Sequence, residues 1–150
     1  MIRPSSEIQV TSRQIPQWER IPNTSIQHKP LIIYHQAFSA SAEELSKHLD
    51  KIGEVSARWT YSMYPQTHFH STSHEVLGVV SGSAKLCFGG EGNPDRFEPE
   101  VSEGDLIIVP AGVGHRLLSE TDEAQRPFMM VGAYPRADPL YGKDGPALKG

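Results

Sequence analysis

Residues 68–75 read His68-Phe69-His70-Ser71-Thr72-Ser73-His74-Glu75. Two imidazoles that stand two residues apart point to the same face when they lie in a strand. Glu75 follows after four residues, enough for a tight turn, and it alternates in step with the apolar residues Leu77 and Val79. We therefore expect Glu75 to be the first residue of an inward-facing row that is otherwise apolar. Its carboxylate should face the two histidines from a neighbouring strand.

A second stretch brings one more histidine to the same place. Residues 110–115 read Pro110-Ala111-Gly112-Val113-Gly114-His115 and follow an apolar run. The two glycines free the backbone for a sharp reversal, so His115 is expected to re-enter the sheet as the first residue of a strand. Its ring would then lie at the mouth of a barrel, level with His68 and His70 when their strands adjoin.

These side chains form a mixed nitrogen and oxygen donor set. Three neutral imidazoles and one carboxylate suit Mn, Fe, Co, Ni or Zn. We predict one divalent transition metal ion at this place, with four residues as its ligands: His68, His70, Glu75 and His115. Four protein ligands on an ion that accepts six leave two positions for water, substrate or O₂.

Short strands and one helix make up the rest of the pattern. Ser41 and Glu44 form a capping box, apolar residues follow at helical spacing, and Gly53 stands where a helix would end. This helix is expected to seal the outside of the sheet. Apolar and alternating residues predict strands at 31–34, 55–63, 67–70, 75–81, 84–88, 96–101, 105–109, 115–119 and 128–134. Many short strands with a single helix predict an all-β sandwich, barrel or jelly roll.

The first thirty residues differ from the rest. Four prolines interrupt a polar stretch, at Pro4, Pro16, Pro22 and Pro30. We expect residues 1–30 to form an extended arm over the domain without regular structure. No repeat or linker divides residues 31–150, which are predicted to form a single domain.

Composition excludes several classes of function. The chain has 150 residues, 37% of them apolar, and a formal net charge of −4. Such a chain is not disordered, and no general attraction to nucleic acid or anionic membranes is expected. The single cysteine, Cys87, makes no intramolecular disulfide. No apolar run is long enough for a signal or a membrane span, so we expect a cytoplasmic protein.

The two stretches resemble the two sequence motifs of the cupin superfamily. His68-x-His70-x₄-Glu75-x₆-Gly82 is similar to the first, and Gly104-x₅-Pro110-x-Gly112-x₂-His115 is similar to the second. The resemblance implies a jelly-roll barrel and the same four metal ligands. One position departs from the pattern, because Ser119 stands where cupins often have an asparagine.

The resemblance extends to the YjlB type, a group of small single-domain cupins. It is carried by residues 70–78 and 82–86, by shorter stretches at 89–91, 111–115 and 132–135, and by 21–23 and 30–34 in and after the arm. Similarity to this group covers nearly the whole chain. It implies a fold but no reaction, since that group has no settled activity.

Several residues near the predicted site have two interpretations. The four ligands could instead form a metal-free cupin pocket in which the histidines bond to one another. His74 is either a partner or replacement ligand, or, as we favour, a loop histidine with an exposed or backbone-bonded ring. Three more histidines lack a partner at ligand spacing and are interpreted as structural: His28, His35 and His48.

Other reactive side chains carry weaker signals. Cys87 alternates against the interior residues of its strand and has no adjacent base, so packing at a subunit contact is favoured over a nucleophilic role. Four residues either line the barrel mouth, to donate a proton or bind a carboxylate, or simply pack there: Arg58, Tyr61, Tyr64 and Tyr134. We favour packing for all four.

Three classes of function follow. The first is a metal-dependent enzyme of dioxygenase or isomerase type that acts on a small molecule. The second is a non-catalytic module that binds or senses a small molecule or metal. The third is a storage or structural role. A complete donor set with open positions favours the first class, since structural metals usually have closed shells. We also expect a homodimer, in which the arm pairs with an edge strand of the partner.

Overall fold

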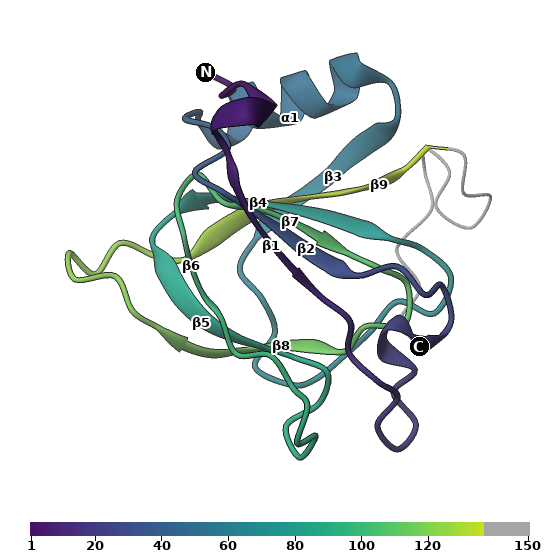
Figure 1. The fold of residues 1–150 in the computed structure, drawn as a ribbon. Helices are drawn as coiled ribbons and strands as arrows, with labels where there is room; N and C mark the ends of the chain where they lie inside the picture. Colours follow the sequence, from purple (N-terminus) through teal and green to yellow (C-terminus); the bar gives the residue numbers. More distant parts are fainter. Residues whose placement is uncertain (137–150) are drawn as a thin grey trace.

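The computed structural model describes residues 1–136 (Figure 1). Two antiparallel sheets face each other, one with strand order β1-β2-β7-β4-β9-β3 and one with order β6-β5-β8. The elements are η1 Ser5–Glu7, β1 Gln9–Arg13, η2 Asn23–Ser25, β2 Leu31–His35, α1 Ala42–Ile52, β3 Val55–Tyr61, β4 Glu75–Ser81, β5 Ser83–Phe88, β6 Glu100–Ser102, β7 Leu106–Val109, β8 His115–Glu120 and β9 Met129–Pro135. The prediction of an all-β domain with one external helix is confirmed. The last part of the predicted domain, residues 137–150, lies outside the described residues.

The main core lies between the two sheets. It takes Leu77 and Val79 from β4, Ile107 from β7, and Leu86 and Phe88 from β5, all almost completely buried. Glu75 precedes Leu77 and Val79 on the same face of β4 and pairs with Val109 of β7. The alternation therefore places a buried carboxylate at the end of an apolar row.

Helix α1 covers the outer face of the six-stranded sheet (Figure 1). Its predicted capping box is present: the Ser41 hydroxyl accepts a bond from the Glu44 N–H, and the Glu44 carboxylate accepts one from the Ser41 N–H. Leu45 and Leu49 are buried against β9 and β3. Leu45 presses on β4 so closely that a Cβ added to Gly78 would lie 2.4 Å from a Leu45 methyl carbon.

A bulge in β3 changes which side chains face inward. Ala57 pairs with Ala133 of β9, but Trp59 pairs with Gly132, so Arg58 is the extra residue. As a result Ala57 packs in the cluster under α1, whereas Trp59 packs against the core between the sheets. A regular strand would have put both on one face.

Three sequence predictions about local structure are wrong. The arm is not irregular, because β1 pairs with β2 of the same chain in the stretch free of proline between Pro4 and Pro16. Residues 67–70 form no strand and make only a single bridge, from His68 to His115. The strand expected at 96–101 is shorter and lies at Glu100–Ser102, preceded by a bridge between Phe97 and Phe88.

Candidate metal site

Backbone hydrogen bonds tie the two motif stretches together. The His68 N–H donates to the His115 carbonyl at 3.1 Å, and the His115 N–H donates to the His68 carbonyl at 2.9 Å. The Gly112 N–H donates to the His70 carbonyl at 2.9 Å. The loop of residues 67–70 therefore runs along the turn before β8, which brings its two imidazoles to the third.

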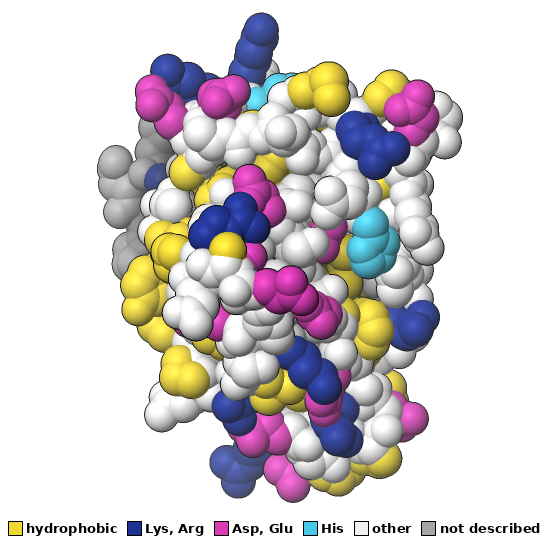
Figure 2. Space-filling view, turned by 90° about the vertical axis from the view of Figure 1, so that its left-hand side faces the viewer, with side chains coloured by type: hydrophobic (Ala, Val, Ile, Leu, Met, Phe, Trp, Pro, Cys, Tyr) yellow, Lys and Arg dark blue, Asp and Glu magenta, His cyan; other side chains and the backbone are white. Residues whose placement is uncertain are grey.

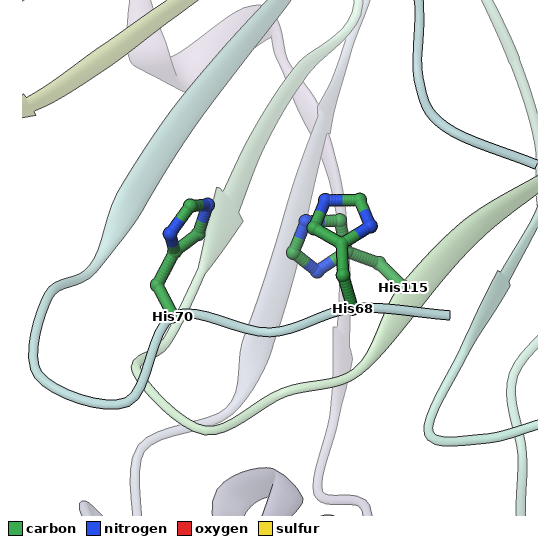
Figure 3. A group of neighbouring side chains, drawn as sticks. All are labelled: His68, His70 and His115. Atoms are coloured by element: carbon green, nitrogen blue, oxygen red, sulfur yellow. The ribbon is translucent and has the colours of Figure 1, made fainter. Parts of the chain in front are cut away.

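The three imidazoles form what we call the histidine cluster: His68, His70 and His115 (Figure 3). Their candidate ligand atoms all lie within 4.8 Å of one another. The rings of His68 and His115 are the closest pair, with centroids 4.2 Å apart, and His70 stands about 6 Å from each. His70 and His115 are buried and His68 is partly exposed. This spacing suits a single metal ion held by three imidazoles.

The Glu75 carboxylate lies beside two members of the cluster. Its oxygens lie 3.5 Å from Nε2 of His70 and 3.5 Å from Nε2 of His115. Burial raises the pKa of the Glu75 carboxyl, but hydrogen bonds and charge from His115 and His70 outweigh burial and hold that pKa well below its usual range. Glu75 is therefore a buried anion at the edge of the cluster, and its charge would offset part of the charge of a divalent cation.

Carbonyl groups orient two of the rings. Nδ1 of His115 lies 2.9 Å from the Val113 carbonyl, and Nδ1 of His68 lies 3.2 Å from the Gln66 carbonyl. A carbonyl accepts only, so each Nδ1 carries the proton of this bond, and in the neutral imidazole that a metal ion requires Nε2 is then the lone-pair donor. Without an ion, the hydrogen bond from Nε2 of His115 to Glu75 needs a second proton on the ring. Such bonds fix the tautomer and direction of metal-binding imidazoles.

A cavity of about 430 Å³ opens above the histidine cluster. Among residues 1–136, thirteen line it: Trp59, Thr60, Tyr61, Ser62, Met63, Tyr64, His68, His70, Glu75, Leu77, His115, Met130 and Tyr134. Its size is that of a site for a small organic molecule. The three tyrosines considered from sequence line this cavity, and Arg58, the bulge residue, does not.

Tyr134 reaches the cluster from β9. Its hydroxyl lies 3.5 Å from Nε2 of His70 and accepts a hydrogen bond of 3.2 Å from the Trp59 indole N–H. Trp59 lies flat over Gly132, where an added Cβ would come within 2.0 Å of the indole ring. The residue pattern carries no signal for this arrangement, because it depends on the bulge in β3.

Comparison with known proteins identifies the domain. Residues 61–131, which contain the histidine cluster and Glu75, match the family described as Cupin domain. The chain carries a cupin domain. It is 36% identical over 117 residues to a protein of Bacillus subtilis (strain 168) named "Uncharacterized protein YjlB", and the match covers 77% of this chain and 64% of the relative. The resemblance to YjlB-type cupins predicted from the motifs is confirmed.

Solved structures resemble the cupin domain more distantly. RmlC from Streptococcus suis, in complex with dTDP-D-xylose, matches with a TM-score of 0.43 and 12% identity over 85% of this chain and 70% of its own. FeII HppE matches with a TM-score of 0.42 and 9% identity over 89% of this chain and 59% of its own. Vicilin from Solanum lycopersicum (tomato) matches with a TM-score of 0.40 and 11% identity over 91% of this chain and 29% of its own. None of these likenesses bears on substrate or reaction.

The N-terminal arm supports the cupin site through Asn23, a residue that the sequence analysis did not single out. Asn23 is completely buried, and its side chain accepts a bond from the Gly114 N–H and donates to the carbonyls of Pro16 and Gly89. Its own N–H donates to the Gly112 carbonyl. Asn23 therefore holds the turn from which His115 enters β8. A buried asparagine between two prolines of a polar arm carries no local pattern that would reveal this role.

The remaining histidines and Cys87 are not among the cavity-lining residues found within 1–136. His74 accepts a hydrogen bond of 3.0 Å from the Ala111 N–H through Nδ1, as favoured for a loop histidine. His35 bonds to the Thr11 hydroxyl at 2.7 Å, and the other two histidines considered structural are exposed. Cys87 is buried outside the core between the sheets, and burial raises the pKa of its thiol.

The surface carries mixed charge. Figure 2 shows acidic and basic side chains intermingled over the middle and lower part of one face, without a continuous basic area. Within residues 1–136, no helix is long and apolar enough to cross a membrane.

Proposed function

We propose that this cupin domain binds one divalent transition metal ion through His68, His70, Glu75 and His115 and acts as a metal-dependent enzyme on a small molecule. The observation that carries the proposal is the convergence of three imidazoles and a buried carboxylate at the base of a cavity. Oxidation of dioxygenase type and isomerisation are the two reaction types that this donor set favours.

The donor set fits such an ion. Imidazole and carboxylate groups suit Fe, Mn, Co, Ni and Zn, and carbonyl partners leave Nε2 of His68 and His115 as donors. A bound ion with open positions would polarise a substrate oxygen or, in the case of iron, support oxidation by O₂. Glu75 offsets part of the ion's charge. Tyr134, held by Trp59, is placed to donate a hydrogen bond or proton to an atom near His70.

Metal content tests the ligand assignment directly. Protein purified without a tag or chelator is expected to hold about one equivalent of Fe, Mn, Co, Ni or Zn by elemental analysis. The His68→Ala/His70→Ala variant should hold none. The matched control is His48→Ala, which removes an exposed imidazole of α1 away from the cavity. Parent protein that holds no metal, even after reloading with each of these ions, would overturn the proposal.

A non-catalytic binding module is the alternative, since the cavity suits capture as well as turnover. The discriminating measurement is oxygen consumption by Fe(II)-loaded protein with a panel of small diketones, thiols and phenols. Consumption that disappears in the His68→Ala/His70→Ala variant supports the enzyme. Silence across the panel, together with saturable binding of a panel member, favours the binding module.

The homodimer predicted from sequence also stays a proposal. Strands β1 and β3 are the edges of the larger sheet, and β1 is mostly exposed. Such edges are open to pairing with another chain. Light scattering is expected to give twice the mass of the chain, and a monomeric mass would overturn the proposal.

A further inference from the structure

The walls of the cavity differ sharply from its base. The base holds the histidine cluster and Glu75, whereas aromatic and thioether side chains form much of the wall. Trp59 and Tyr134 stand next to the base, and Met63 and Met130 are both buried against the core. Thioethers adapt to flat rings and make favourable contacts with them.

The opening of the cavity is also aromatic. Tyr61 and Tyr64 lie at this opening with ring centroids 6.0 Å apart and planes tilted by 55°. The two side chains are 56% and 46% exposed, so large parts of both rings remain accessible to a ligand. Tyr64 in turn presents its ring at 70° to that of His68, with centroids 5.3 Å apart. Aromatic rings therefore run from the opening to the cluster.

Charge on the walls is low. Among residues 1–136, no lysine or arginine lines the cavity, and Glu75 is the only carboxylate that does. A phosphate or carboxylate on the body of a ligand would therefore find no lysine or arginine among the described wall residues. Polar recognition by these walls falls to hydroxyl groups, of which Tyr134 is the one that lies beside His70.

We propose that the ligand of this cavity is a flat aromatic molecule whose body is uncharged and whose hydroxyl or carbonyl oxygen faces the histidine cluster and Tyr134. The inference rests on the proposed function for the identity of the site and adds the class of substrate. The ring lies among Trp59, the two methionines and the tyrosines of the opening. Aromatic pairs prefer offset or edge-to-face contacts, which tilted rings of this kind provide.

A pair of ligands that differ in aromaticity tests this inference. 2-Naphthol has a flat aromatic body, and decahydro-2-naphthol has the same carbon skeleton and hydroxyl without the π system. Affinities are measured by ligand-observed NMR titration on the full chain, once metal-free and once loaded with zinc. We expect 2-naphthol to bind roughly fivefold more tightly or better, because only its rings make aromatic contacts with the cavity walls. Decahydro-2-naphthol is the more apolar of the two, so burial of apolar surface alone would give the opposite order of affinity.

A rim variant assigns the preference to these residues. Tyr61→Leu/Tyr64→Leu keeps apolar side chains at the opening and removes both rings. It should lower the affinity for 2-naphthol and leave that for decahydro-2-naphthol nearly unchanged. The control is Ile52→Ala, which alters an exposed apolar residue of α1 and should change neither affinity.

Three outcomes overturn the inference. They are equal affinity for the two ligands, no binding of either ligand in both metal states, and a preference that is undiminished in the rim variant. A dimer that dissociates in the rim variant, without binding of either ligand, would assign the tyrosines to a subunit contact instead.

Zinc content measured on the same samples separates this inference from the proposed function. Zinc retained without an aromatic preference means that only the inference fails. An aromatic preference in protein that retains no zinc means that the metal-dependent function fails and the aromatic pocket stands.

Discussion

The two faces of strand β4 are both covered by other parts of the chain, but by different means. On the outer face, Val76 and Val80 pack in the apolar cluster under α1. On the inner face, Leu77 and Val79 pack in the main core, and Glu75 ends the row beside two imidazoles. One face therefore consists of apolar contacts alone, and the other ends in a polar site.

This difference separates stability from chemistry within a single strand. Apolar burial stabilises the fold at about 25 cal/mol per Å². A buried carboxylate contributes little net stability, because the free-energy cost of removing it from water offsets much of the gain from its hydrogen bonds and charge partners. We therefore expect changes on the outer face to alter the free energy of unfolding and to leave metal binding intact. Changes around Glu75 should weaken metal binding and alter the free energy of unfolding chiefly through its dependence on pH.

The largest effect on the free energy of unfolding is expected from Leu45→Ala, which removes the side chain that α1 packs against β4. Leu45 is 2% exposed and lies against Gly78. Truncation of a buried leucine costs about 2–5 kcal/mol of unfolding free energy. Guanidinium denaturation should show this loss, while folded protein keeps its zinc equivalent. Loss of zinc affinity in the folded variant would show that the two faces are coupled.

Gly132→Ala tests the inner face of β9, where Trp59 lies flat over the glycine. The added methyl group must displace the indole, and overpacking of this kind costs about 1–3 kcal/mol. It should also break the bond from Trp59 to the Tyr134 hydroxyl. In a double-mutant cycle with Trp59→Leu, the cost of Gly132→Ala should nearly vanish, because the clash is gone. Additive costs would mean that the strain lies elsewhere.

Much of the fold follows from the sequence because its signals are local. The capping box at Ser41 and Glu44 sets the start of α1, and alternation after Glu75 sets the inner face of β4. The turn glycines before His115 place that histidine at the start of β8. The convergence of His68, His70 and His115 was likewise expected from spacing and is what the structure shows.

The features of the fold and the site that could not be predicted from the sequence depend on contacts between residues far apart in the chain. Residues 67–70 form no strand, since their backbone bonds go to one turn, and yet His68 and His70 still meet His115. The bulge at Arg58, which turns Trp59 inward, leaves no mark in the residue pattern. Asn23 bonds to a turn residue that is 91 positions away along the chain.

Asn23→Ala should have an intermediate effect and should lower both the free energy of unfolding and the affinity for zinc. It leaves the buried Gly114 N–H and the carbonyls of Pro16 and Gly89 without their partner. Such losses cost about 1–3 kcal/mol. Asn23→Gly is the control for the left-handed backbone at this position, where φ is 54°. Both variants should bind zinc more weakly in a chelator competition, because the turn before His115 is loosened. Unchanged zinc affinity in both would show that β8 alone positions His115.

The smallest effect is expected from Glu75→Gln in metal-free protein, where only the dependence of stability on pH changes. Hydrogen bonds and charge from His115 and His70 hold the pKa of Glu75 well below its usual value of 4.5, against the effect of burial. Below about pH 4.5 the unfolded chain therefore binds a proton that the folded chain does not, so stability falls as the pH falls. Above that pH the contribution of this carboxylate is fully present.

Urea denaturation between pH 6 and about pH 3 should thus show a steeper loss of unfolding free energy for the parent than for Glu75→Gln, by up to about 1.4 kcal/mol per pH unit. Parallel curves would mean that the carboxylate gains nothing from its two imidazoles, and the inner face of β4 would then resemble the outer face in energetic terms.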